Sequence, residues 1–348
     1  MKYFWMTLSW LWSKRGYLAM SFLSALLFFA WLFPFGDLSD MVTSKVAQAT
    51  GNQIYLQFET MNLGYLPMPS LSATKVSVET PGLPPLDANW IKISPGWVNL
   101  LLNAWTIKKA ATGDPGASAS LMTHISGSVA AEGILGGDID LSLSPGSKGE
   151  GGRERSKVYL ALNKMNLADV RKWAELSVEI QGQVDLATTL QITPDFAAQP
   201  EGDLELQVRK FNLPASTVET PMGPLNMPAL TLSNVTLRGR LSNGSLIIED
   251  GSFGGSKDPL NGRIKGQMAL RLQPTGAGIQ TIFGAYNLTV DLNTSKQIDQ
   301  DKSMSLAFFL FDSAKTAGAN GSKYLFRAQG QGVGVQYPPP TITRITSY

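Results

Sequence analysis

Few side chains in this sequence are suited to chemistry. The chain of 348 residues has one histidine, His124, and no cysteine. Without cysteine there are no disulfides, no thiolate nucleophiles and no Cys-ligated metals. A Ser-His-Asp triad would have to use His124, but the G-x-S-x-G elbow that presents such a serine is missing. We therefore predict that His124 is an ordinary strand residue and that the chain is not an enzyme.

Acidic residues form only two small groups that resemble metal ligands. Asp138 and Asp140 alternate along a predicted strand, which favours a solvated sheet face. Asp299 and Asp301 lie in a polar segment typical of a turn. A zinc site would need several His or Cys ligands. We expect no metal and no cofactor.

The N-terminal segment is the most informative part of the chain. Residues 16–35 are uncharged, and about 20 apolar residues are needed for a helix to cross a bilayer. We predict a transmembrane anchor there, preceded by a cytoplasmic stub, residues 1–15. A cleaved signal peptide is the alternative, but no small-x-small cleavage site follows Phe35.

Charge predicts the orientation of this anchor. The stub carries basic residues and no acid, and short positive flanks stay in the cytoplasm, so the bulk of the chain is expected outside. Tryptophans near the ends of the span suit the membrane interface. The residues assigned to anchoring and orientation are Lys2, Lys14, Arg15, Trp10, Trp12 and Trp31. A net charge of +2 argues against a nucleic-acid partner.

A short helix and a large β domain are predicted to follow the anchor. Residues 36–51 have apolar residues at helical spacing, which predicts a helix. This helix could lie on the membrane surface or cap the core of the domain. We favour the cap, because the polar face of the helix is not notably basic. From 52 to 348, apolar and polar residues alternate, for example over 138–143, 157–162 and 204–208. We predict a mainly β fold with a few short helices, at 95–103 and 166–176.

Asn-Gly and Asp-Gly pairs, polar segments and prolines predict where the strands of the β region end. Asn243-Gly244 and Asp250-Gly251 are typical of tight hairpin turns. Residues 145–156 have nothing apolar to bury and are predicted to form a mobile loop, most simply within one continuous sheet. The prolines at 338–340 are expected to end the sheet.

Weak internal repeats indicate an elongated sheet. The segment 180–186 (IQGQVDL) matches 264–270 (IKGQMAL). A second unit, Met or an aromatic residue followed by Asn-Leu, begins at Met61, Met165, Phe211 and Tyr286. Repeated strand–turn units that stack on their neighbours predict a solenoid-like antiparallel sheet.

This layout resembles a known family. The chain is similar to the N protein of the type II secretion system in its divergent form. The similar features are the anchor, a helix ending in AQATG at 47–51, and the segments 243–256 (NGSLIIEDGSFGGS) and 260–266 (LNGRIKG). The layout is also similar to AsmA-like proteins, whose repeats form a long curved β-groove. The resemblance implies a bacterial inner-membrane protein with a periplasmic β domain, and other secretion-system proteins as its partners.

Two functions follow from this resemblance. The first is an accessory or assembly component of a type II secretion system that acts through protein–protein contact. The alternative is an AsmA-like protein that binds or transfers lipid. In a lipid-binding protein one face of the sheet would line a groove, and in a scaffold the same face would form a closed core. This face is expected to be apolar in both cases. Its predicted members are Leu204, Leu206, Val208, Leu288, Val290 and Leu292. We expect a largely closed core with at most a shallow groove.

Overall fold

A computed structural model provides the structure of the chain. It describes Tyr17, Met20, Ser21, Ser24, Phe28, Phe308, Pro338 and Tyr348, together with residues 39–49, 54–64, 69–80, 83–102, 126–148, 154–174, 179–193, 198–220, 223–227, 229–275, 278–300, 311–318, 321–332 and 340–346. None of the helices in these parts is long and apolar enough to cross a membrane. His124 and most of the predicted anchor lie outside the described residues. So do Lys2, Lys14, Arg15, Trp10, Trp12 and Trp31.

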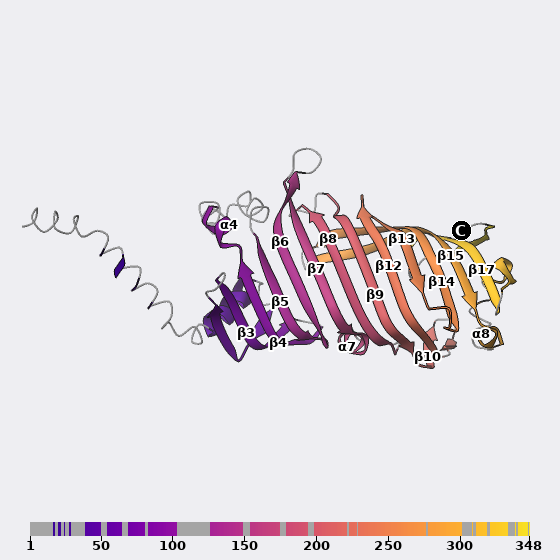
Figure 1. Cartoon of the computed structure of the whole chain (residues 1–348), viewed down its shortest axis with the longest axis horizontal. Coiled ribbons are helices and arrows are strands. Elements are labelled where there is room, and N and C mark those ends of the chain that lie inside the picture. The colour runs from indigo at the N-terminus through magenta and orange to yellow at the C-terminus, as the bar shows by residue number, and fades with distance from the viewer. Residues whose placement is uncertain are drawn as a thin grey trace, which may run out of the picture.

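One antiparallel sheet of 16 strands dominates the fold, which confirms the mainly β prediction. Its order is β1-β3-β4-β5-β6-β7-β8-β9-β12-β13-β14-β15-β17-β16, with β2 paired to β3 and β18 to β17. Most strands therefore pair with their neighbours in sequence, and the sheet extends along the long axis of the molecule (Figure 1). The first eight strands are β1 (Tyr55–Gln57), β2 (Thr60–Gly64), β3 (Ser70–Thr80), β4 (Leu83–Pro95), β5 (Gly127–Ile134), β6 (Gly137–Lys148), β7 (Glu154–Asn166) and β8 (Gln181–Ile192). The others are β9 (Glu201–Leu213), β12 (Leu230–Ser242), β13 (Ser245–Phe253), β14 (Leu260–Thr275), β15 (Gly278–Thr294), β16 (Lys315–Ala317), β17 (Ser322–Gly330) and β18 (Thr341–Arg344). A separate hairpin consists of β10 (Ser216–Thr220) and β11 (Gly223–Met227).

The described helices are short and lie at the margins of the sheet. They are α3 (Ser39–Ala49), α4 (Trp97–Leu102), α7 (Leu167–Trp173), α8 (Lys296–Gln300) and the 3-10 helix η3 (Asp312–Ala314). The predicted helix at 36–51 is thus present as α3. It packs beside the edge strand β1, where Thr43 donates a 2.9 Å hydrogen bond to the carbonyl of Leu56. Asn166 caps α7 by accepting a hydrogen bond from the amide of Ala168, as its place before a helical segment predicts.

Three predictions about loops, turns and the end of the sheet need correction. Residues 145–156 are not a free loop: Pro145 pairs with Ser156 and Lys148 with Glu154, and only 149–153 lie outside the described residues. Asp250-Gly251 is no turn, since both residues lie within β13 beside a bulge. The prolines at 338–340 do not end the sheet, because β18 follows them and pairs with β17. Asn243-Gly244, with φ of 51° and 72°, forms the predicted turn between β12 and β13.

Corresponding residues of the internal repeats have the same backbone conformation. Lys164 and Lys210 both precede the Asn-Leu unit, and both have left-handed backbones, with φ of 55° and 53°. Gly182 and Gly266 occupy the same place in the other repeat, with φ of 141° and 142°. A Cβ at Gly266 would collide with the carbonyl oxygen of Asn287 on the neighbouring strand. These repeats therefore mark equivalent backbone irregularities in different strands of the sheet.

Candidate functional site

The register of the strands places apolar residues in continuous rows across one side of the sheet. Residues directly opposite each other on paired strands project to the same side. The central row is Met61, Ala73, Ile91, Ala131, Ile139, Leu162, Leu186, Leu206, Leu237, Gly251, Ile264, Val290 and Phe326. We call this side the apolar face.

Three further rows lie beside the central one. The second row is Leu63, Leu71, Ile93, Val129, Leu141, Leu160, Thr188, Leu204, Gly239, Ile248, Gly266, Leu288, Ala328 and Ile342. The third is Leu143, Val158, Leu190, Gly202, Leu241, Leu246, Met268 and Tyr286. The fourth is Met165, Val184, Val208, Val235, Phe253, Gly262, Leu292 and Tyr324.

The six residues predicted for this face all belong to it, in matched pairs. Leu204 and Leu288 share the second row, Leu206 and Val290 the central row, and Val208 and Leu292 the fourth. Sequence reasoning missed the other members because it had alternation within a strand but no register between strands. The alternation over 138–143 and 157–162 already contained Leu141 and Leu160.

No member of the four rows is charged. Thr188 is the one polar residue of the first two rows, and its hydroxyl donates a 2.8 Å hydrogen bond to the carbonyl of Asp203. This side chain is therefore satisfied by its own sheet and offers little to a partner.

The apolar face is partly exposed in its N-terminal part. Leu71, Ile93 and Leu141 are 37%, 48% and 38% exposed, whereas Ala131 and Thr188 in the same rows are buried. No separate sheet faces these rows within the described ranges, where the only other sheet is the β10–β11 hairpin, but the far half of the β14–β15 hairpin crosses this side (Figure 1). The expectation of a largely closed core with at most a shallow groove therefore stays a prediction for this part of the molecule.

The C-terminal end of the apolar face is closed. Leu292, Ala314, Tyr324 and Phe326 are at most 8% exposed, and partly buried apolar residues from η3, β18 and their surroundings pack against them. Two aromatic stacks hold the closure together. Phe308 lies on Tyr324 with ring centroids 5.2 Å apart, and Phe311 lies on Phe326 at 4.7 Å.

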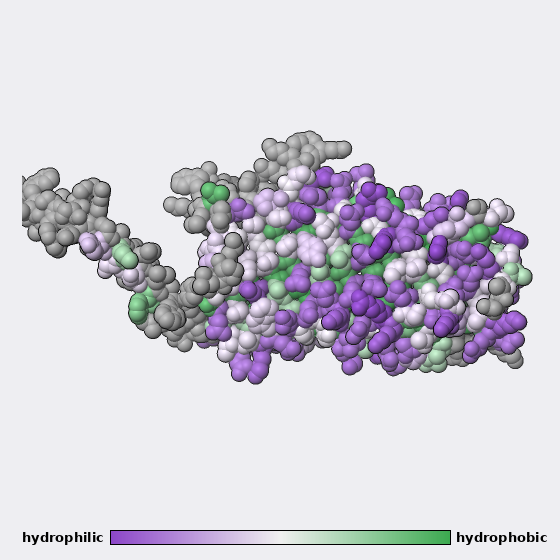
Figure 2. Space-filling model, in the orientation of Figure 1, coloured by the Kyte–Doolittle hydropathy of each residue, from purple (hydrophilic) through white to green (hydrophobic). Residues whose placement is uncertain are grey.

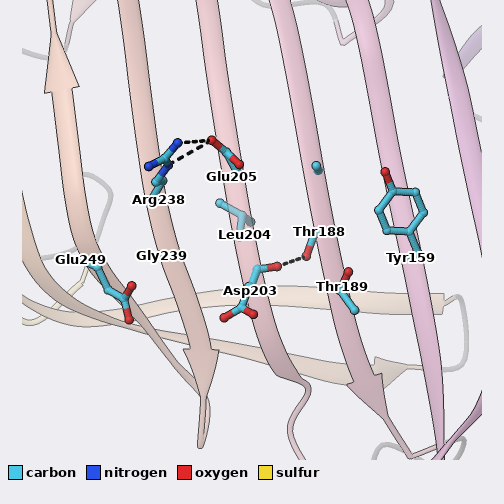
Figure 3. Close-up of a pocket in the computed structure, with 10 residues that line it drawn as sticks. Tyr159, Thr188, Thr189, Asp203, Leu204, Glu205, Arg238, Gly239 and Glu249 are labelled. Atoms are coloured by element: carbon cyan, nitrogen blue, oxygen red, sulfur yellow. Dashed lines mark hydrogen bonds and ion pairs between the residues drawn. The ribbon is translucent and has the colours of Figure 1, made fainter.

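The opposite face of the sheet is rich in polar and charged side chains, with some apolar residues visible along its middle (Figure 2). Cross-strand ion pairs join Arg238 to Glu205 at 2.9 Å, Arg240 to Glu249 at 3.0 Å and Arg209 to Asp185 at 3.1 Å. A shallow hollow of about 310 Å³ lies among these pairs (Figure 3). Arg238, Glu205 and Glu249 on its lining take part in these pairs and it is open to solvent, so it has the features of a sheet surface held in register rather than of a reaction site.

Two of the four acidic candidates have structural partners, and Asp301 lies outside the described residues. Asp140 lies on the polar face and accepts a 3.3 Å hydrogen bond from Asn163. Asp299 accepts hydrogen bonds from the hydroxyls of Thr294 and Ser322, at 2.6 and 2.7 Å, and ties α8 to β17. Among the described residues, no three His, Cys, Asp or Glu side chains come together in a way that could hold a metal ion.

Comparisons with protein-family models, with curated proteins and with solved structures find no match for this chain. The resemblance to the secretion-system N protein and to AsmA-like proteins therefore stays a prediction. The function must be argued from the two faces of the sheet.

Proposed function

We propose that this protein binds the acyl chains of lipids along its apolar face. The observation that carries the proposal is the set of uncharged rows, which are partly exposed on β3, β4 and β6. Apolar surface exposed to water costs about 25 cal/mol per Å². Contiguous patches of this kind mark binding surfaces in monomeric proteins.

The composition of the face favours lipid over a protein partner. Protein interfaces concentrate aromatic residues and Arg at their centres and carry many hydrogen bonds. From β3 to β12 the four rows contain no aromatic and no charged residue, and their one hydroxyl, Thr188, is already bonded. Aliphatic side chains without polar anchors suit a saturated chain, which needs contact area and no hydrogen bonds.

The dimensions of the face also suit a lipid. Eight neighbouring strands, from β3 to β9 and then β12, carry the aliphatic part of the face. At about 4.8 Å per strand, seven steps span about 34 Å. This length exceeds a single acyl chain, because two opposed chains fill a hydrocarbon core of about 30 Å.

With the predicted anchor at 16–35, the proposal describes an AsmA-like periplasmic domain held at the bacterial inner membrane. The assembly role in type II secretion stays a prediction. In that role the apolar face would be covered by another protein.

Site-specific photo-crosslinking tests the proposal in cells. Leu141 and Ser142 are adjacent in β6 but project to opposite faces, and Leu141 is exposed enough to replace. We would place p-benzoylphenylalanine at each position in turn, label the lipids with ³²P-phosphate and irradiate. A radioactive lipid adduct is expected at position 141 and not at 142.

Two results would overturn the proposal. Equal labelling at both positions would show non-specific contact with membrane. A discrete protein adduct at 141 without lipid would favour the secretion-system role instead.

A further inference from the structure

The distal half of the β14–β15 hairpin leaves the sheet. β13 pairs with β14 only as far as Ala269, and β17 pairs with β15 only from Tyr286 onward. Between these points Leu270 pairs with Phe283, and the two strands continue as a ribbon to Thr275 and Gly278. We call residues 270–275 and 278–283 the ribbon. In Figures 1 and 3 it crosses behind the strands, on the side away from the polar side chains.

Small residues allow the hairpin to bend where the ribbon begins. The register shifts between Met268 and Leu270, opposite Gly284 and Ala285. A Cβ at Gly284 would lie 3.1 Å from the Cβ of Ala269, so the two strands approach closely at the bend. A β-bulge at such a point redirects a hairpin out of its sheet.

Gln199 holds the ribbon in place. This half-buried side chain lies just before β9, and its amide pairs with the backbone of Leu272 in both directions. Nε2 donates to the Leu272 carbonyl at 3.1 Å, and Oε1 accepts from the Leu272 amide at 2.9 Å. The amide of Leu270 also donates to the carbonyl of Gly244 at 2.9 Å. An isolated two-stranded ribbon is only marginally stable, so these contacts decide its position.

The ribbon has an apolar and a polar side. Leu270 and Leu272 are half-buried, whereas Arg271 and Gln273 between and after them are exposed. Phe283 pairs with Leu270 and shares its side. The β14 strand of the ribbon thus repeats the alternation of the main sheet, whereas on β15 both Phe283 and Ile282, which lies opposite Arg271, are exposed.

We propose that the ribbon is the second wall of the lipid site and that Gln199 is its positioning residue. This inference rests on the proposed function. A ligand held between the ribbon and the apolar face must be long, flexible and unbranched. The ribbon therefore selects single acyl chains lying across the strands and retains them against loss to the side.

The test combines lipid retention with the motion of the ribbon in the full chain. Gln199→Ala removes both amide contacts, whereas Gln199→Glu keeps an acceptor for the Leu272 amide and loses the donor. Gln207→Ala is the matched control, since Gln207 lies on the polar face and bonds to Asn234. With p-benzoylphenylalanine at 141, we expect the lipid adduct to fall about tenfold in Gln199→Ala, the scale of one or two lost hydrogen bonds. Gln199→Glu should be intermediate and Gln207→Ala unchanged.

A spin label reports on the ribbon independently of lipid. Because the chain has no cysteine, Ile282→Cys gives a single labelling site at a position that is 40% exposed. Gln199→Ala should raise the mobility of this label, and Gln207→Ala should not.

The outcomes separate the two proposals. If the parent chain gives no lipid adduct at 141, the proposed function and the ribbon's role fail together. If the parent chain binds lipid but Gln199→Ala leaves either the adduct or the label mobility unchanged, the proposed function stands and the ribbon's role is overturned.

Discussion

Asp258 has the most strongly organised carboxylate in the described part of the β domain. It accepts hydrogen bonds from the amide and hydroxyl of Ser233, at 2.6 and 2.8 Å, and from the amide of Gly255 at 2.7 Å. The hydrogen bond from the Ser233 amide is the main cause that lowers the pKa of Asp258 from its usual 3.8, and burial opposes it only in part. The group fastens the turn before β14 to β12.

We predict that Asp258→Asn lowers the free energy of unfolding by about 1 kcal/mol at neutral pH, because it weakens hydrogen bonds to a charged acceptor. The pKa is lower in the folded state, so the stabilisation is fully present above the unfolded pKa of about 3.9. It is lost as the pH falls through the folded pKa. Thermal unfolding of both proteins between pH 7 and pH 2 should show the difference shrinking in acid; a difference that is constant with pH would contradict this account.

Single residues of the apolar face were only partly predictable. Alternation within a strand is local, and it correctly assigned Leu206 and Val290 to one side. Their shared row depends on β12, β13 and β14 between them, and on the bulge between Ile248 and Gly251. Gln199 carries no signal in the sequence, because its partner is the backbone of a residue 73 positions away.

Bulged strands are the recurring element of this fold. In β7 the register shifts between Leu162 and Met165, around the left-handed Lys164, whose amide donates to Asp185 at 2.8 Å. A left-handed backbone costs a non-glycine residue about 1–2 kcal/mol. The strand therefore contains strain that the interactions around the bulge offset.

We predict opposite effects of glycine at two lysines of β7. Lys164→Gly should raise the free energy of unfolding by about 0.5–1 kcal/mol, since glycine adopts this conformation without strain. Lys157→Gly, at an exposed and regularly paired position, should lower it by a similar amount. Urea titrations of the full chain measure both. Destabilisation by Lys164→Gly equal to that at Lys157 would show that no strain is relieved.

The same elements show what local sequence cannot specify. Asn243-Gly244 was correctly predicted as a turn because both residues adopt positive φ readily. Asp250-Gly251 has the same composition but lies inside β13, because pairing with both β12 and β14 overrides turn preference. Residues 145–156 extend the β6–β7 hairpin for a similar reason, since backbone pairing needs no apolar side chain.

Burial is uneven across the whole molecule. Tyr324 and Phe326 at the closed end are 2% and 5% exposed, whereas Leu141 in β6 is 38% exposed. A contiguous cluster of buried side chains lies at the C-terminal end, whereas single buried residues such as Val76 and Met165 are spread along the rest of the sheet.

Truncation at two positions should reveal this difference. Phe326→Ala is expected to cost about 3–5 kcal/mol, as for other buried aromatic residues. Leu141→Ala should cost about 1 kcal/mol or less, because much of its surface is already in contact with solvent. The measurement is the free energy of unfolding in urea, compared between the two variants. Similar costs at both positions would mean that the middle of the sheet is covered as fully as its end.

Aromatic side chains close one end of the apolar face, and this closure limits the direction in which a bound acyl chain can move along the rows. The closing residues are Phe308, Phe311, Tyr324 and Phe326. A chain that slides along the rows from the side of β3 reaches a dead end at β17 and has to leave the way it came. Under the proposed function, the protein therefore holds a bound lipid chain and does not pass it from one end of the sheet to the other. Delivery to a second membrane would then need an acceptor that comes to the open end.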